Sequence, residues 1–356
     1  MSTSNRKLEH LRICLEEDVE SNYTGFEDVS FIHHALPEID FDEINIKVEF
    51  LGKKLSAPFL IASMTGGHPE TKEINKKLAI AVQELGIGMG VGSQRAAIED
   101  ERVADSFSIV REFAPKAFIY ANVGISQVLK YGVEFVEKAI EMIDADAIAI
   151  HLNFLQEAIQ PEGDRNAKNC LNVLEEVCES IKVPVIVKET GAGISRDIAI
   201  KLKLIGVDAI DVGGKGGTSW SGVEVYRAKD KVTKEVGMDF WDWGIPTAFC
   251  IAECYDILPV IATGGLRSGL DLAKALALGA KVGSSALPFL KAVVKEGVEG
   301  VKNLFNYYIK GLKIAMFLTG CRTVDELRKV PIFITGTFKD WLELRGYDIV
   351  KFCRMR

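Results

Sequence analysis

Short apolar segments recur along the chain at nearly regular intervals, and amphipathic stretches of helical length separate them. Eight segments are short, apolar and rich in β-branched or small residues, which is typical of buried strands. They lie at 58–64, 87–91, 117–122, 145–150, 184–188, 209–212, 260–262 and 281–284. Because these segments are apolar throughout rather than at alternate positions, we expect both faces of the sheet to be buried.

The stretches between these segments have the length and the ends of helices. Several begin after a serine or asparagine and end at a glycine, as capped helices do. The best-defined lie at 70–85, 133–143, 169–181, 195–205 and 268–278. Strands that alternate with helices form a parallel sheet, and eight of them predict an α/β fold of the (β/α)8 TIM-barrel type. A doubly wound open sheet is the alternative, but no GxGxxG motif follows the first strand.

The predicted barrel forms a single domain with extensions at both ends. We expect an N-terminal extension over 1–56, the barrel over 57–330 and a C-terminal tail over 331–356. The interval between the sixth and seventh strands, 213–259, is long and contains three of the four tryptophans. We interpret it as an extended functional loop followed by a helix. After the eighth strand, 286–330 is predicted to be helical.

Composition is that of an ordinary globular protein and excludes some partners. The net charge of −7 argues against binding to nucleic acid or to an anionic membrane surface. The polar N-terminus has no signal segment, and no apolar run is long enough to cross a membrane. Seven cysteines occur without a CxxC pair, and Cys250 and Cys254 are expected to be buried thiols. These features together predict a reducing, cytoplasmic location.

Small or polar residues follow every predicted strand. In barrel enzymes the chemistry lies at the carboxyl ends of the strands, so these residues are expected to meet at one site. They are SMTGG at 63–67, MGVGSQR at 89–95, Asn122 with Gly124, the segment 151–163, KETGAG at 188–193, GGKGGTS at 213–219, TGGLRSG at 263–269 and SSALP at 284–288. One such turn would be weak evidence, but eight in register indicate function.

The last three strand ends are the most specific, and they predict a site for a phosphorylated ligand or cofactor. Glycine has no Cβ, so backbone N–H groups can approach an anion closely. Thr218 and Ser219 add hydroxyl donors, and Arg267 adds a bidentate cation. The loops after the last two strands are the usual phosphate site in such barrels. The alternative is that these glycines only shorten the loops.

The segment HLNFLQEAIQPEG, 151–163, is expected to form one wall of the site. It follows an apolar strand and at once presents His151, Asn153, Gln156 and Glu157. Glu157 is a candidate Mg²⁺ ligand, because one carboxylate with phosphate oxygens and water is a common Mg²⁺ arrangement. Alternatively, Glu157 is an exposed glutamate at the start of a helix.

Several cations have no obvious structural role. Lys188 ends a buried strand, where an ammonium needs an anion such as a reduced flavin. It would otherwise pair with Glu189 or another carboxylate. Arg6 and Lys7 form a small basic cluster with His10. Together with Gln94 and Arg95 they are candidates to bind a second, strongly anionic ligand, although Arg6 and Lys7 alone would be better explained as a solvated terminus.

These motifs in combination resemble type 2 isopentenyl-diphosphate isomerases. The resemblance runs from Arg6 to about Pro288 and rests on RK, SMTGG, MGVGSQR, HLNxLQExxQPEG, VxVKE, GGxGGTSW and TGGLRSG. It implies an FMN-dependent (β/α)8 barrel that interconverts isopentenyl and dimethylallyl diphosphate. It also implies Mg²⁺, a flavin reduced by NADPH or NADH, and a homotetramer or homo-octamer.

The resemblance further implies a role for each matched residue. Those at the flavin would be Ser63, Met64, Thr65, Ser93, Asn122 and Lys188. Those at its phosphate would be Thr218, Gly265, Leu266, Arg267, Ala286 and Leu287. Those at the substrate diphosphate would be Arg6, Lys7, Ser93, Gln94 and Arg95. His151 and Gln156 would border the substrate as catalytic residues, and Glu157 would carry Mg²⁺.

The implied chemistry is an isomerisation with no net redox, in which reduced FMN is the acid and base and Gln156 lies nearby. Two other functions remain alternatives. An FMN-dependent oxidase of hydroxy acids would need a histidine base and an arginine for a carboxylate, and would leave the Arg6–Lys7 pair unexplained. A non-catalytic flavin sensor would leave all the diphosphate-binding cations unexplained.

Overall fold

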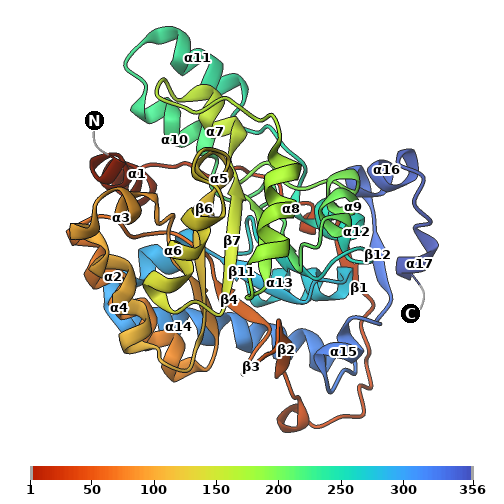
Figure 1. Ribbon diagram of the computed structural model, residues 1–356. Helices are drawn as coiled ribbons and strands as arrows, with labels where there is room; N and C mark the ends of the chain where they lie inside the picture. Colours follow the sequence, from red (N-terminus) through yellow and green to blue (C-terminus); the bar gives the residue numbers. More distant parts are fainter. Residues whose placement is uncertain (1–2, 354–356) are drawn as a thin grey trace.

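The computed structural model describes residues 3–353, and its centre is a closed barrel of eight parallel strands (Figure 1). Each strand pairs with the next one in the sequence, and the last pairs with the first. The strands are β4 Phe59–Ile61, β5 Gly88–Gly90, β6 Phe118–Gly124, β7 Ala147–Leu152, β8 Val185–Glu189, β9 Ala209–Asp211, β10 Val260–Ala262 and β11 Val282–Ser285. All eight predicted strands are confirmed, and the barrel replaces the open-sheet alternative.

Helices surround the barrel, and the five best-defined predictions are confirmed with small shifts at their ends. These five are α2 Pro69–Leu85, α6 Val133–Ile143, α8 Cys170–Ser180, α9 Arg196–Leu204 and α13 Gly269–Leu278. The chain also forms α3 Arg95–Glu99, η3 Glu101–Val103, α4 Asp105–Phe113, α5 Ile125–Tyr131, α7 Phe154–Ile159, α14 Leu287–Leu318 and α15 Val324–Leu327. Two consecutive helices meet within α14 at Gly297, whose φ of 64° interrupts the helix.

The interior of the barrel is packed with side chains, so it is a core and not a channel. Leu60, Phe118 and Ile186 are among the fully buried residues that fill it. A hairpin of β2 Val48–Phe50 and β3 Lys53–Leu55 closes the amino-terminal end, where the Phe50 ring meets Phe118 edge to face. The hairpin lies below the strands in Figure 1, which leaves the carboxyl ends as the open end of the barrel.

The interval 213–259 differs from its prediction as an extended loop followed by one helix. It forms three helices, α10 Trp220–Arg227, α11 Lys231–Asp239 and α12 Thr247–Cys254. Ser219 and Asp230 cap α10 and α11 by accepting hydrogen bonds from Gly222 N and Thr233 N. The extended-loop prediction was therefore wrong. The first two helices project above the barrel (Figure 1), and α12 contains Cys250 and Cys254 as the predicted buried thiols.

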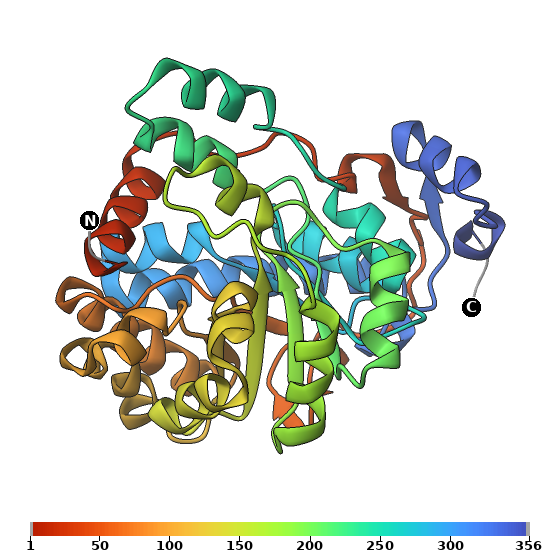
Figure 2. The same ribbon diagram turned by 45° about the horizontal axis from the view of Figure 1, so that its top comes forward.

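Both terminal segments pack against the barrel. The first begins with α1 Thr3–Glu16, which contacts α10 and α14 at the open end of the barrel (Figure 2). It continues through η1 Phe26–Asp28, β1 Val29–Phe31 and η2 Phe41–Glu43. The C-terminal segment adds β12 Ile332–Ile334, α16 Gly336–Leu344 and α17 Val350–Cys353, and β12 pairs antiparallel with β1. Across residues 3–353, no helix combines the length and the apolarity needed to span a membrane.

Candidate active site

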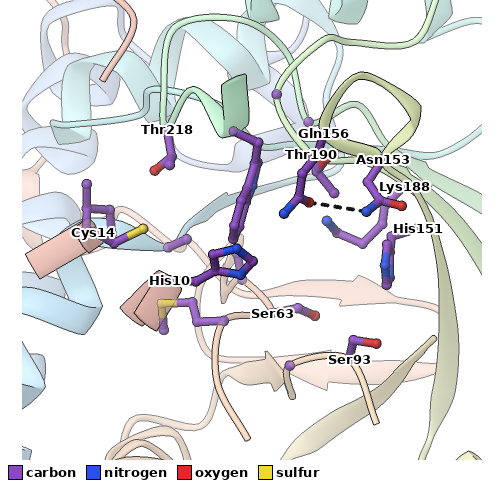
Figure 3. A pocket seen from close by; sticks show the side chains of 18 of the residues that line it. His10, Cys14, Ser63, Ser93, His151, Asn153, Gln156, Lys188, Thr190 and Thr218 are labelled. Carbon is purple, nitrogen blue, oxygen red and sulfur yellow. Dashed lines mark hydrogen bonds between the residues drawn. The ribbon is translucent and has the colours of Figure 1, made fainter. Parts of the chain in front are cut away.

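A cavity of about 260 Å³ lies where the carboxyl ends of all eight barrel strands meet. Each strand end contributes lining residues, as the sequence predicted. Helix α1 lines the cavity with Arg6, Lys7, His10 and Cys14, and α10 adds Trp220. His10 and Cys14 are visible at the cavity in Figure 3. Segments that are far apart in the sequence thus form one continuous wall.

Most of the predicted site residues line this cavity. They are Arg6, Lys7, Ser63, Met64, Thr65, Ser93, Arg95, Asn122, His151, Gln156, Glu157, Lys188, Thr218, Gly265, Arg267, Ala286 and Leu287. Ser63, Ser93, His151, Gln156, Lys188 and Thr218 are visible together in Figure 3. The structure therefore brings together residues from all the motifs on which the family resemblance rests.

The side chains of Gln94 and Leu266 do not reach the cavity, so their predicted contacts are corrected. Gln94 is fully buried beneath the wall, where Oε1 accepts from Asn122 N (3.0 Å) and Nε2 donates to Ala139 O (2.7 Å). Its amide joins the second and third strand ends and has no group left for a diphosphate. The Leu266 side chain packs in the core, and its carbonyl accepts from Tyr308 Oη at 2.8 Å, Arg267 Nη1 at 2.9 Å and Ser285 Oγ at 3.2 Å.

A cradle of glycines lies between the sixth and seventh strand ends. A Cβ on Gly265, whose φ is 77°, would lie 2.1 Å from Gly216 O, and one on Gly217 would lie 2.8 Å from Gly265 N. No other residue type fits this close approach of two backbones. Helix α14 begins at Leu287 without a side-chain cap. Pro288 has no N–H, and Phe289 N and Leu290 N donate to Ala286 O at 3.0 and 3.1 Å, so among the described residues the Leu287 N–H is the first-turn donor left for an anion.

Arg267 stands beside this cradle and already has a carboxylate partner. Its Nε donates to Glu20 Oε1 at 2.9 Å, Nη2 contacts the same oxygen, and Nη1 donates to Leu266 O at 2.9 Å. No local pattern indicates this pairing, because Glu20 lies in the N-terminal segment, far from the seventh strand.

His151 is held as a neutral imidazole. Its Nδ1 lies 2.9 Å from Asn122 Oδ1, and Asn122 Nδ2 donates to Val91 O, which fixes the orientation of the amide. Nδ1 therefore carries the proton, and Nε2 has the lone pair. Burial, together with the nearby charges of Lys188 and Lys7, lowers the pKa of His151 to about 3. At neutral pH, Nδ1–H donates to Asn122 Oδ1, Nε2 can accept a hydrogen bond, and the imidazole is not a general acid.

Lys188 presents an ammonium at the floor of the cavity. Its Nζ donates to the backbone carbonyl of Glu189 at 3.1 Å and not to the carboxylate. The Glu189 carboxylate instead accepts from the N–H groups of Thr190, Gly191 and Ala192, at 2.6, 2.8 and 2.5 Å. The predicted alternative of a Lys188–Glu189 ion pair is therefore not observed, and the ammonium is available to an anionic group.

Gln156 is held between two groups that the sequence did not identify as a unit. Its Nε2 donates to Glu224 Oε1 (2.9 Å), and its Oε1 accepts from Asn153 Nδ2 (3.2 Å; Figure 3). Glu224 also bonds His10 Nε2 at 3.0 Å and Arg227 Nη1 at 2.5 Å. Burial opposes ionisation of Glu224, but hydrogen bonds from His10 and Gln156 and the charge of Arg227 hold its pKa below the usual value.

Glu157 is buried in the first turn of α7, which excludes the interpretation as an exposed helix-start glutamate. Oε1 accepts from Asn153 Nδ2 (3.0 Å), and Oε2 accepts from Gln160 Nε2 (2.6 Å) and Asp164 N (2.7 Å). Among residues 3–353, no group of three or more His, Cys, Asp or Glu side chains could hold a metal ion. Glu157 fits a metal only if a ligand and water supply the remaining oxygens.

Three cations gather near the first and second strand ends. Lys7 is half-buried, donates to Gly66 O at 3.2 Å, and also contacts Ser93 O. Burial, with a further contribution from the charge of Arg6, lowers the pKa of Lys7 to about 7. Arg6 and Arg95 complete the group, and Arg95 pairs with Glu99 along α3. An anion that enters here would meet three cationic side chains at one edge of the cavity.

The fold and the glycine cradle define a barrel of the flavoprotein type. A family model described as FMN-dependent dehydrogenase matches residues 15–117 and 155–332. Solved structures of mandelate oxidase with 2-hydroxy-phenylacetamide (TM-score 0.63, 18% identity, 95% of this chain, 100% of the other) and of flavocytochrome b2 with benzoylformate (0.65, 20%, 96% and 88%) share the fold.

Curated relatives narrow this assignment. The isopentenyl-diphosphate delta-isomerase of Archaeoglobus fulgidus is 67% identical over 97% of this chain and 100% of its own length. Those of Methanosarcina mazei (57%, 98% and 96%) and Thermococcus kodakarensis (51%, 99% and 96%) are also similar over nearly the whole chain. The chain belongs to the isopentenyl-diphosphate delta-isomerase family.

Proposed function

We propose that this protein is an enzyme that interconverts isopentenyl and dimethylallyl diphosphate, with FMN and Mg²⁺ bound and no net oxidation or reduction. The observation that carries the proposal is that one cavity contains two separate sets of anion-binding groups. The glycine cradle with Arg267 suits the phosphate of a cofactor, and Arg6, Lys7 and Arg95 suit a diphosphate. The high identity to named isopentenyl-diphosphate delta-isomerases supports this choice of substrate.

The polar groups of the cavity fit FMN. The hydroxyl of Thr65 is buried and has no hydrogen-bond partner among the described residues, so a polar edge of a flavin would satisfy it. The Lys188 ammonium would stabilise the negative charge of a reduced flavin. Reduced FMN, kept reduced by NADPH, would supply the acid and base of the reaction. We propose that Ser63, Met64, Thr65, Ser93, Asn122, Lys188, Thr218, Gly265, Arg267, Ala286 and Leu287 hold it.

The substrate diphosphate would bind between the cations and Glu157. Arg6, Lys7 and Arg95 would neutralise its charge, and the hydroxyl of Ser93 would donate a hydrogen bond. Glu157 would hold Mg²⁺, with diphosphate oxygens and water as the other ligands. The amides of Asn153 and Gln160 keep the Glu157 carboxylate oriented toward the cavity, which reduces the reorganisation needed when the metal binds.

The remaining wall residues would place the reacting carbons. Migration of this double bond adds one proton, removes another, and passes through an intermediate with positive charge. Gln156, clamped by Asn153 and Glu224, would orient the carbons, and the ionised Glu224 would favour nearby positive charge. Neutral His151 would accept a hydrogen bond without adding a competing positive charge. Trp220 and α1 would exclude water from the intermediate.

An anaerobic assay with each diphosphate tests this proposal. We expect isopentenyl diphosphate to yield dimethylallyl diphosphate when FMN, Mg²⁺ and NADPH or dithionite are present, and no product after chelation. The same preparation should not reduce FMN when a 2-hydroxy acid is added. Rapid flavin reduction by a hydroxy acid would favour the oxidase alternative, and lack of turnover with bound, reduced FMN would favour the sensor.

We also propose that the protein assembles as a homotetramer or homo-octamer. The support is an apolar surface on and next to α11, where Val232, Val236, Met238 and Trp243 are exposed. Light scattering coupled to gel filtration tests this, and a monomeric mass at micromolar concentration would contradict it.

A further inference from the structure

Glu20 is paired with Arg267, the cationic side chain that would bind the cofactor phosphate. Two of the three guanidinium nitrogens of Arg267 contact Glu20 Oε1, Nε at 2.9 Å and Nη2 more closely. The third donates to Leu266 O at 2.9 Å. Both side chains are about one-third exposed, at 34% for Arg267 and 33% for Glu20, so the pair lies at the edge of the cavity and not in the core.

The backbone of Glu20 is fixed in this position. The segment 19–21 pairs antiparallel with the loop after β9, through Ser21 N to Gly217 O (2.8 Å) and Ser219 N to Val19 O (2.7 Å). Trp241 Nε1 adds a hydrogen bond to Glu20 O at 3.2 Å. Because the Glu20 backbone is fixed, rotation of its side chain can separate the carboxylate from Arg267 but leaves the negative charge close to the glycine cradle.

A phosphate monoester that enters the cradle would therefore meet one cation and one fixed anion. It must either displace Glu20 from Arg267 or share the guanidinium with it, and in both cases the carboxylate repels it. Riboflavin has the same ring and ribityl chain but no phosphate, so it would not experience this repulsion. The effect of Glu20 is thus specific for phosphorylated flavins.

We propose that Glu20 is a built-in competitor for the cofactor phosphate at Arg267 and that it sets the affinity for FMN. This inference rests on the proposed FMN site but not on the reaction catalysed there. The opposite role is that Glu20 holds Arg267 in the correct orientation for the phosphate. The Glu20→Gln substitution distinguishes these two roles, because the amide oxygen still accepts from Arg267 while the negative charge is removed.

The test is the dissociation constant of full-length protein, stripped of flavin, for FMN and for riboflavin, measured by quenching of flavin fluorescence. For Glu20→Gln we expect FMN to bind about tenfold more tightly at low salt, the order of magnitude for a partly exposed charge pair. Riboflavin should bind within about twofold of the wild type. Glu17→Gln removes the same charge from an exposed neighbouring position and should change neither constant.

General damage to the fold would weaken FMN and riboflavin binding alike, so the ratio of the two dissociation constants within one variant is insensitive to it. Glu20→Ala should also raise the preference for FMN over riboflavin. Weaker FMN binding in Glu20→Gln, or an equal change for both flavins, would overturn the proposal. If FMN and riboflavin behave as expected but neither diphosphate is converted, the proposed reaction fails and the role of Glu20 stands. If turnover is normal but the ratio of the FMN and riboflavin dissociation constants is unchanged in Glu20→Gln, the proposed reaction stands and the role of Glu20 fails.

Discussion

Gln156 Nε2 donates a hydrogen bond to Glu224 Oε1 at 2.9 Å, across 68 residues of sequence. The same carboxylate bonds His10 and Arg227, so helices α1, α7 and α10 meet at one buried ionised group. This contact fixes which end of the Gln156 amide faces the carboxylate, and it connects the wall of the cavity to the helix that supplies Arg6 and Lys7.

Replacing Glu224 by glutamine should therefore impair the chemical step more than cofactor binding. A hydrogen bond to a charged group contributes about 1.5–3 kcal/mol, and losing this contribution in the transition state corresponds to a fall in kcat of about 10- to 100-fold. The dissociation constant for FMN should change less than about twofold. Steady-state kinetics and flavin titration check this, with the exposed Glu235→Gln of α11 as control. Equal losses of kcat and FMN binding would indicate a merely structural role.

Lys7 should impose a pH dependence on substrate capture. Its pKa is lowered to about 7 in the free protein, and an anionic diphosphate favours the ammonium, so binding above pH 7 must take up a proton. We expect kcat/KM to be flat just below about pH 7 and to fall up to about tenfold per pH unit above it. A guanidinium at this position would stay charged, so Lys7→Arg should flatten the profile between about pH 7 and 9. An unchanged slope in this variant would exclude Lys7 as the titrating group.

Glu157→Gln should separate metal use from flavin binding. The carboxylate is the charged group that would hold Mg²⁺, and the amide keeps its size but not its charge. We expect kcat/KM to fall at least about 100-fold, a typical loss for a metal ligand, with FMN still bound. Glu157→Asp should recover part of the activity at higher Mg²⁺ concentrations. Full activity of the wild type in excess chelator would exclude the metal role.

Gly265→Ala should destroy the cradle, because the new Cβ would lie 2.1 Å from Gly216 O. The free energy of unfolding should fall by more than the roughly 1 kcal/mol expected for a positive φ alone, and FMN affinity should fall with it. Gly346→Ala is a matched control, since its φ of 78° is nearly equal but nothing lies within 4 Å of its Cβ position. Chemical denaturation of both variants measures the difference, and equal losses would contradict a steric role for Gly265.

The fold followed from local pattern to a large extent. Eight apolar strands and capped helices are local features, and each strand end carried its polar residues in the sequence itself. The helix predicted at the end of 213–259 is confirmed as α12, but α10 and α11 were missed because the tryptophans and short polar runs there resemble a loop. Their Ser219 and Asp230 caps are visible in the sequence, but each is a single residue without an apolar periodicity beside it.

The site was less predictable where the direction of a side chain decides its role. Gln94 and Arg95 are adjacent in the sequence, yet Arg95 lines the cavity and Gln94 points beneath it to Asn122 N and Ala139 O. Glu224 and Glu20 were missed for a different reason. Each acquires its meaning only from a partner more than about 60 residues away, and no local motif records such a contact.

In the proposed reaction the diphosphate is isomerised without net consumption of electrons. The most direct test is an anaerobic reaction in which NADPH is limiting and just sufficient to reduce the bound FMN once, followed by quantification of dimethylallyl diphosphate. We expect many molecules of product for each NADPH oxidised, with the flavin still reduced at the end. One product molecule or fewer per NADPH, with the flavin returning to its oxidised state, would contradict it.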